Sequence, residues 1–187
     1  MDTDARRNQF VAAAFELYAE KGIAQTTIGD ISNRVGVARS LFYHYFPSKT
    51  AITQAVVDDR VADLLMQFES WAISYDKYSS RASLATIVSS VRGYLRNPES
   101  FTSIMIRENN DTLHHLFTVK SAMQLAQRYA HMKASGLKNL SEFPMRHPQE
   151  SFYVLAVGLI SIMSRYPEVP DEALVDIIAD ALHVDLC

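Results

Sequence analysis

The sequence predicts an all-α protein of about nine helices. Apolar residues recur at spacings of three and four along most of the 187 residues, and no alternating pattern of useful length occurs. Glycine or proline stands at the ends of several of these segments, as it does where helices end or begin. We expect a three-helix N-terminal domain over residues 1–50, joined by a long helix to a larger helical domain over residues 51–187.

Composition and charge narrow the class of protein. The net charge is −3, with seven basic and seven acidic residues in 1–60 and eleven against fourteen in 61–187. One cysteine, Cys187, can build neither a disulfide framework nor a cysteine-based metal site within one chain. The N-terminus lacks the apolar core of a signal peptide, and the longest apolar run, 154–163, is about half of a membrane span. We expect a cytoplasmic protein without a membrane partner.

The first expected helix covers residues 6–21. Its apolar residues fall at i, i+3, i+4, i+7 and i+8, and they are Phe10, Ala13, Ala14, Leu17 and Tyr18. Gly22 ends it. This helix is expected to be the scaffold of the small N-terminal domain.

Two short helices follow, separated by one glycine. Thr27 has the side chain of an N-cap, and Asp30 stands three residues later, where a carboxylate favours the helix start. Gly36 can take φ > 0 and end this helix in a tight turn. The next helix runs from about residue 38 to 45, before Pro47. Helix, turn and helix over about twenty residues form the helix-turn-helix pattern, whose second helix enters a major groove of DNA.

The second short helix has two different faces. One face is apolar and can pack inward, with Val37, Leu41, Phe42 and Phe46. The other offers groups that can reach base edges or phosphates, namely Arg39, Ser40, Tyr43 and His44. Arg34, Arg39 and Lys49 give this stretch three cations and no acid, which favours DNA phosphates. The alternative is that these three are ordinary solvated charges.

This stretch resembles the N-terminal DNA-binding domain of the TetR family of bacterial regulators. The match covers roughly residues 8–56 and ends on the distinctive run YHYFPSK; it includes Thr27, Ile28, Ile31, Gly36, Val37, Tyr43, Tyr45, Phe46, Ser48 and Lys49. Ser40 and Leu41 depart from the usual pattern. The resemblance implies that Lys49 reaches a DNA phosphate. Our candidate DNA contacts are therefore Thr27, Arg39, Ser40, Tyr43, His44 and Lys49.

The rest of the chain gives a coarser series of helices. A fourth helix, capped by Ser48, is expected over residues 49–74, and it would link the small domain to the large one. After a polar break at 75–80, helices are expected over 82–96, 99–107, 111–138, 148–166 and 170–184, with a loop at 139–147. Pro148 and Pro170 are well placed to begin the last two.

The last two helices are our candidates for a homodimer interface. A helix that is apolar over most of its circumference must be buried on more than one side. The residues concerned are Phe152, Leu155, Ala156, Leu159, Met163, Leu174 and Ile178. Burial in the core of a single chain is the alternative; the resemblance favours a four-helix dimer interface.

An effector pocket is expected between the middle helices, where large side chains and two polar groups gather. Pockets of this kind are mostly apolar with a few polar anchors. The candidates are Tyr94, Phe101, Met105, Arg107, His114, Phe117 and Met123, and their alternative role is to fill the core.

These features together predict a dimeric DNA-binding regulator, a repressor rather than an activator, that leaves a palindromic operator when a small molecule binds. No catalytic residue, cofactor or metal is expected, because the six histidines are scattered and no catalytic or metal-binding motif occurs. A helical protein-interaction adaptor is the alternative, and an enzyme a weaker one.

Overall fold

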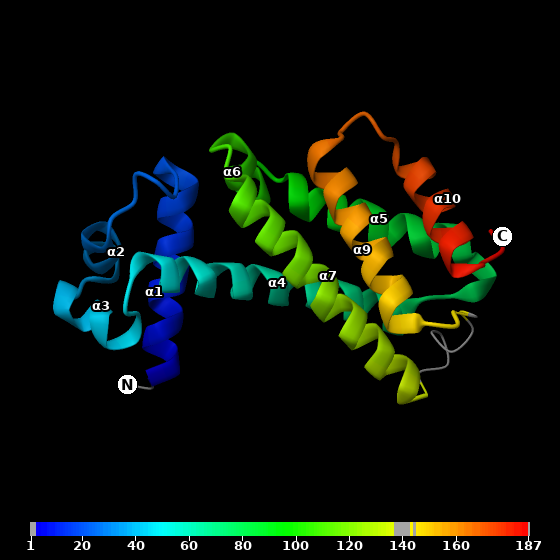
Figure 1. The fold of residues 1–187 in the computed structure, drawn as a ribbon, viewed down its shortest axis with the longest axis horizontal. Coiled ribbons are helices and arrows are strands. Elements are labelled where there is room, and N and C mark those ends of the chain that lie inside the picture. Colours follow the sequence, from blue (N-terminus) through cyan, green and yellow to red (C-terminus); the bar gives the residue numbers. More distant parts are fainter. Residues whose placement is uncertain (1–2, 137–142, 144, 187) are drawn as a thin grey trace.

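The computed structural model describes residues 3–136, 143 and 145–186, and over these residues it is all-α. They form nine α-helices and one 3₁₀ turn, without a strand. The elements are α1 (Thr3–Lys21), α2 (Ile28–Val35), α3 (Arg39–Tyr45), α4 (Lys49–Ser74), η1 (Lys77–Ser79), α5 (Ser80–Arg96), α6 (Phe101–Arg107), α7 (Asp111–Ala134), α9 (Pro148–Arg165) and α10 (Asp171–Leu182). Figure 1 shows a small group of helices, α1–α3, at one end of α4, and the others gathered along its remainder. We call the first group the head and the second, α5–α10, the body.

The head is built around one aromatic cluster. Phe10 of α1 is fully buried and meets Phe42 of α3 edge-on, with ring centroids 5.5 Å apart. Phe46, just after α3, packs on the same ring at 6.3 Å. Buried aromatic side chains contribute more apolar area than any other residue type. This cluster therefore fixes α3 on α1 and decides which face of α3 is left to solvent.

Helix α4 belongs to both parts of the molecule. Its first turns pack on the head, where the Thr53 hydroxyl lies 2.8 Å from the Tyr18 hydroxyl and Ile52 is fully buried. Its far half is buried in the body through Phe68 and Trp71. A domain boundary at residue 50 would therefore separate most of the first turns of α4 from the head, on which they pack.

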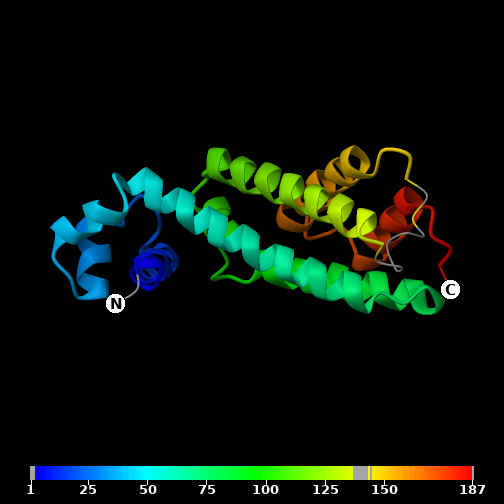
Figure 2. The ribbon, with the colours of Figure 1, turned by 90° about the horizontal axis from the view of Figure 1, so that it is seen from below.

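Ion pairs and hydrogen bonds fasten the body helices to one another. Arg165 at the end of α9 binds Asp111 at the start of α7 at 2.6 Å, so the two helices run antiparallel. Lys120 and Arg128 of α7 pair with Asp58 and Glu69 of α4, which Figure 2 shows running alongside α7. Similarly, the pair of Arg92 with Asp171 at 2.5 Å holds α10 on α5. No described helix has the length and apolarity of a membrane span.

The expected helices are all present, and most of their ends lie within three residues of the prediction. Helix α7 ends at Ala134, earlier than expected; the expected end at 138 and most of the 139–147 loop lie outside the described residues. The prediction of a polar break at 75–80 was wrong for Tyr75. This side chain is buried and packs on Trp71 and Phe143, with ring centroids 5.5 and 5.3 Å away. An aromatic ring at a helix end can cover the core although its neighbours are polar.

Candidate nucleic-acid interface and body cavity

The start of α2 is fixed by a reciprocal pair of hydrogen bonds. The backbone N–H of Asp30 donates to the Thr27 hydroxyl at 3.1 Å, and the backbone N–H of Thr27 donates to the Asp30 carboxylate at 2.8 Å. This capping box satisfies two N–H groups that the helix itself leaves unpaired. Lys21 and Thr27 hold the pKa of the Asp30 carboxyl well below its usual range. The side chain of Thr27, a candidate DNA contact, is thus already used to begin the helix, although it remains exposed.

The turn between α2 and α3 depends on Gly36. Its φ is +75°, in the left-handed region, and its N–H donates to the carbonyl of Asn33 at 3.1 Å. The next N–H, of Val37, donates to the carbonyl of Ser32 at 3.0 Å. These bonds close the end of α2 and turn the chain directly into α3, so the predicted helix-turn-helix geometry is present.

Helix α3 turns its polar face outward. Arg39, Ser40, Tyr43 and His44 are all exposed, whereas Phe42 and Phe46 are buried and Val37 and Leu41 are half-buried. Each of the four exposed side chains can hydrogen-bond to a base edge or a phosphate. The structure thus brings four of the six candidate DNA contacts onto one exposed helix of seven residues.

Two of these side chains are already arranged relative to each other. The Arg39 guanidinium donates to the Tyr43 hydroxyl at 3.1 Å, and its carbon lies 5.8 Å from the centre of the Tyr43 ring. The pair stands one turn apart on the same face of α3. A guanidinium held in this way is oriented before it meets DNA, which lowers the entropy lost on binding.

The cations of this region are not equivalent. Arg34 donates to Glu16 at 3.0 Å and to Glu20 at 2.6 Å, both on α1, and these bonds raise its pKa above the usual value. Arg34 is therefore neutralised within the head, and counting it with the DNA-facing cations overstated the local positive charge. Lys49 donates to the backbone carbonyl of Ala24 at 3.2 Å. Its ammonium holds the loop before α2 and has to leave this carbonyl to reach a phosphate.

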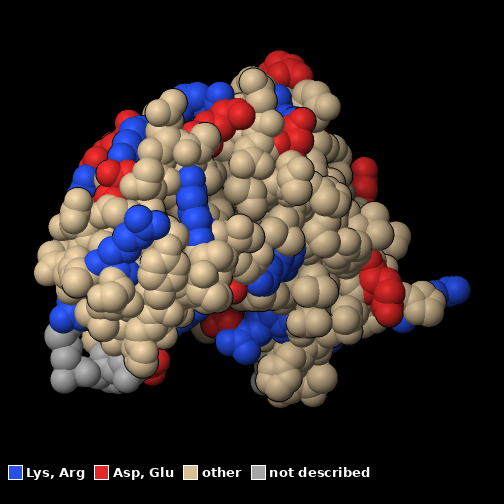
Figure 3. Space-filling view, turned by 60° about the vertical axis from the view of Figure 1, so that its left-hand side comes forward, with Lys and Arg blue, Asp and Glu red and all other residues tan. Residues whose placement is uncertain are grey.

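A further cation next to α3 escaped the sequence reasoning. The guanidinium of Arg7, exposed near the start of α1, lies 5.1 Å from the centre of the Phe46 ring. Only the pair Arg6-Arg7 before the first apolar residue could have pointed to it. Figure 3 turns the head toward the viewer and shows Lys and Arg scattered among uncharged side chains, with Asp and Glu mostly toward the margins.

Comparison with known proteins identifies this arrangement. The family model described as "Bacterial regulatory proteins, tetR family" matches residues 10–56, which span most of α1, the helix-turn-helix and the first turns of α4. The helix-turn-helix head is therefore similar to the DNA-binding domain of the TetR family. An uncharacterised helix-turn-helix regulator of Bacillus subtilis, YvdT, is 33% identical over 67 residues, which are 36% of this chain and 34% of YvdT. The repressor KstR2 of Rhodococcus jostii is 30% identical over 83 residues, 44% of this chain and 40% of KstR2.

These two alignments span between a third and two fifths of the relatives' own length. A longer alignment joins the chain to the regulator SrpR of Pseudomonas putida, at 24% identity over 86% of this chain and 74% of SrpR. Among solved structures, the TetR-family repressor AlkX from Dietzia superposes with a TM-score of 0.68 over 95% of this chain and 96% of AlkX, at 17% identity. The likeness to AlkX shows that the two chains share an all-helical fold over 95% of this chain.

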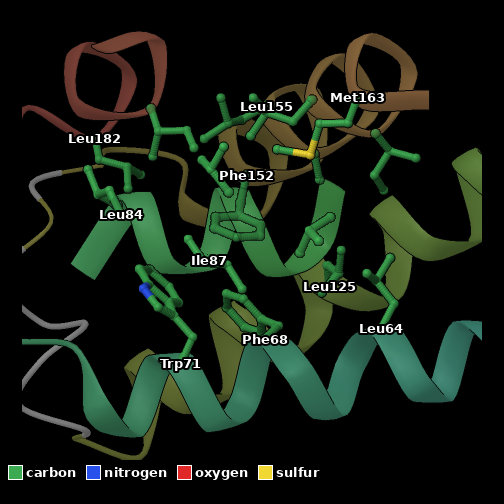
Figure 4. A pocket seen from close by; sticks show the side chains of 16 residues that line it. Leu64, Phe68, Trp71, Leu84, Ile87, Leu125, Phe152, Leu155, Met163 and Leu182 are labelled. Carbon is green, nitrogen blue, oxygen red and sulfur yellow. The ribbon is translucent and has the colours of Figure 1, made fainter. Parts of the chain in front are cut away.

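The body contains a partly open cavity of about 90 Å³. Helices α4, α5, α7, α9 and α10 all contribute to it, as Figure 4 shows from close by. The sixteen described residues of its wall are all apolar: Leu64, Phe68, Trp71, Leu84, Ile87, Val88, Val91, Leu125, Phe152, Leu155, Ala156, Leu159, Ile160, Met163, Ile178 and Leu182. The one polar atom on these side chains, the Trp71 indole N–H, donates to the carbonyl of Ser83 at 2.8 Å.

None of the seven predicted pocket residues is among the described residues that line this cavity. Phe101, Met105 and Phe117 fill the core, where large side chains leave no space around them. His114 is also buried, and its Nε2 has no hydrogen-bond partner among the described residues. Tyr94 borders an open groove between α4 and α5, Met123 is exposed on α7, and Arg107 lies against α1. Contact with an effector stays a prediction for these residues.

The predicted dimer residues lie around the cavity instead. Six of them line it, and the seventh, Leu174, is fully buried. Their apolar pattern is therefore explained, at least in part, by packing within one chain. The outward positions of the same helices are held by Val154, 70% exposed, and Ile177, 43% exposed. Sequence periodicity could not separate an inner apolar face from an outer one on helices that carry both.

Proposed function

We propose that this protein is a dimeric transcriptional repressor that binds operator DNA through α3 and releases it when a small molecule occupies the body. The observation that carries the proposal is the division of α3 into a buried aromatic face and an exposed face of four hydrogen-bonding side chains. The TetR-family match over the same residues supports it.

In this proposal α3 lies in the major groove. Arg39, Ser40, Tyr43 and His44 contact base edges or the adjoining phosphates. The N-terminus of α4 meets a phosphate, helped by Lys49 once its ammonium leaves the Ala24 carbonyl. Thr27, exposed at the start of α2, is placed to contact the backbone on the other side of the turn.

We infer a dimer because a palindromic operator has two half-sites, and each half-site binds one head. A helix-turn-helix dimer binds two half-sites about one DNA turn apart, roughly 34–36 Å. We place the dimer contact on the outward faces of α9 and α10, where Val154 and Ile177 are exposed. Exposed apolar residues on neighbouring helices favour an interface with a second apolar surface.

The effector step uses the cavity between α4 and the other body helices. A ligand that binds better in a second arrangement of these helices shifts the population toward it. Because α4 runs from the cavity wall at Phe68 and Trp71 to the head at Ile52, this rearrangement changes the placement of the heads. The spacing of the two α3 helices then no longer matches the operator.

The test is selection of bound fragments from a random DNA duplex library, followed by a salt titration on the winning sequence. We expect a near-palindromic site whose affinity falls steeply as salt rises, because phosphate contacts release counterions. A library that yields no enriched sequence at low salt contradicts the proposal, and the protein-interaction adaptor then becomes the better account of the exposed α3 face.

A further inference from the structure

The cavity in the body shares part of its wall with an open groove on the surface. The groove lies between α4 and α5 and holds about 530 Å³. Trp71 of α4 and Ile87 of α5 line both spaces. A molecule in the groove is thus separated from the cavity by these two side chains, which Figure 4 shows side by side on the cavity wall.

The two spaces differ in chemistry. The described residues of the cavity wall offer a guest no hydrogen-bonding group, because all are apolar and the Trp71 N–H is already bonded to Ser83. A polar or charged group placed there loses its water without compensation. At about 90 Å³ the cavity is smaller than an engineered apolar cavity of about 150 Å³ that binds benzene. Its guest is therefore a short alkyl chain.

The groove, in contrast, combines neutral polar side chains with apolar ones. The neutral polar ones include four hydroxyls and one amide, from Ser70, Ser74, Thr86, Ser90 and Gln67. Asp63 is the one carboxylate among the described residues that line the groove, and no Lys or Arg is among them. Arg60, one turn from Asp63, is committed to Asp59 and Asp63. A ligand hydroxyl or amide can hydrogen-bond to these polar side chains, whereas a ligand carboxylate finds no cationic side chain among the described residues of the groove.

We propose that the effector is an uncharged amphiphile, whose short apolar tail passes between Trp71 and Ile87 into the cavity while its hydroxyl or amide head stays in the groove. The inference rests on the proposed function only in taking this cavity as the effector site. It adds the ligand class, the route of entry and the exclusion of carboxylates.

Of the two wall residues, Ile87 is the one placed to move. Trp71 is buried and fixed by its hydrogen bond to Ser83 and by edge contact with the Tyr75 ring at 5.5 Å. Ile87 is half-buried and has no polar atom to anchor it. Rotation of an aliphatic side chain at the surface is fast compared with helix movement. The tail therefore passes Ile87 without any helix leaving its place.

Trp71 also supplies the measurement, because it is the one tryptophan in the sequence. Its fluorescence is titrated in the full-length protein with 1-hexanol and with hexanoate at pH 8, where the acid is ionised. We expect 1-hexanol to shift the emission with saturation, and hexanoate to need at least about tenfold higher concentration. Equal or tighter binding of hexanoate overturns the proposed ligand class.

A matched pair of surface variants tests the role of the groove directly. Ser90→Lys adds a cation inside the groove, and Ser89→Lys adds the same charge one residue away, outside the groove lining. Both positions are exposed, so neither change disturbs the core. We expect Ser90→Lys to raise the affinity for hexanoate relative to that for 1-hexanol about two- to fivefold, the range of an exposed ion pair. An equal effect of Ser89→Lys places the head outside the groove and overturns the route.

Operator binding is measured separately by anisotropy of labelled DNA, which distinguishes the two proposals. If Trp71 responds to 1-hexanol but operator affinity does not change, the effector step of the proposed function fails and the ligand class stands. If the protein binds its operator but Trp71 responds to neither probe, the inference fails and DNA binding stands.

Discussion

Two arginines of the helix-turn-helix, Arg34 on α2 and Arg39 on α3, have different surroundings. Arg39 points to solvent with Tyr43, whereas Arg34 is bonded to Glu16 and Glu20 on α1. Both carry the same charge and lie five positions apart, so a simple count of cations treats them alike. The two side chains differ because Arg34 faces α1 and Arg39 faces solvent. Substituting each of them in turn therefore tests which one contacts DNA.

Arg39→Ala is expected to weaken operator binding by about 1–3 kcal/mol and to relax sequence preference, because it removes a base-reading guanidinium. Arg34→Ala is the matched control, with the same loss of charge on the neighbouring helix. Its operator affinity should stay within about twofold of the parent, since Arg34 is neutralised inside the head. Anisotropy of labelled operator measures both. A larger loss for Arg34→Ala than for Arg39→Ala is incompatible with our assignment of α3.

Because His114 is buried, we predict that the free energy of unfolding depends on pH. Its side chain is buried, and burial, followed by the charge of Arg165, lowers its pKa below the ordinary value of about 6.5. Below that value the unfolded chain takes up a proton that the folded chain does not, so the free energy of unfolding decreases as the pH falls from about 6.5 toward the folded pKa.

We expect urea unfolding to show lower stability at pH 5.5 than at pH 7.5, and His114→Gln to reduce that difference. His115→Gln is the control, because His115 is exposed on the next position of α7. The two measurements are made as denaturation curves at each pH. If the pH dependence persists in His114→Gln and disappears in His115→Gln, our assignment of the effect to His114 is wrong.

At the scale of the elements, the turn between α2 and α3 depends on one residue, Gly36. Gly36 has φ +75°, and a Cβ built there meets no described atom within 4 Å. The cost of a side chain is therefore backbone strain rather than a clash. Gly36→Ala should destabilise the protein by about 1–2 kcal/mol, the cost of left-handed backbone for an L-residue. Thermal unfolding measures this change.

Gly93 provides the opposite case on an ordinary helix. It lies in α5, its added Cβ also meets no described atom within 4 Å, and its φ is not positive. Gly93→Ala should stabilise by about 0.5–1 kcal/mol, because alanine loses less backbone entropy in a helix. If both substitutions change the unfolding temperature in the same direction, the difference in backbone conformation does not govern the two sites.

The same elements show how much of the fold and of the candidate site could be predicted from the sequence. In the head, the Thr27 cap, Gly36 and the spacing of Phe42 and Phe46 fix the helix register, and the register tells which side chains of α3 are exposed. In the body, periodicity identifies buried residues but does not tell whether their neighbours fill the space around them. Phe117 is thus plain core, while Leu155 and Met163, expected at a dimer interface, border a cavity.

At the scale of the whole molecule, two features of the described residues connect the body to the head. One is α4, which is continuous from the cavity to the head. The other is the end of α6, where a Cβ added to Gly22 would lie 1.8 Å from the Glu108 carboxylate oxygen, and where Arg107 donates to the carbonyl of Ala19 at 3.5 Å. Glu108 thus lies directly against the end of α1. A rearrangement of the body can reach the head through either contact.

Glu108→Ala removes the part of the second contact that Glu108 makes with Gly22, and it leaves the Arg107–Ala19 hydrogen bond, the cavity and α3 in place. We expect operator affinity without effector to change less than about twofold, and the loss of affinity on adding effector to become smaller. Allosteric couplings are typically about 1–3 kcal/mol, so a partial loss is measurable. Glu99→Ala is the control, because Glu99 is exposed just before α6, at its other end.

Linkage supplies an internal check on this experiment. The factor by which effector weakens operator binding must equal the factor by which operator weakens effector binding. Operator anisotropy gives the first factor and Trp71 fluorescence the second, for the parent and for Glu108→Ala. A variant that retains the full factor in both directions shows that the contact of Glu108 with Gly22 carries none of the coupling. A reduced factor, equal in both directions, assigns part of it to the contact of Glu108 with Gly22.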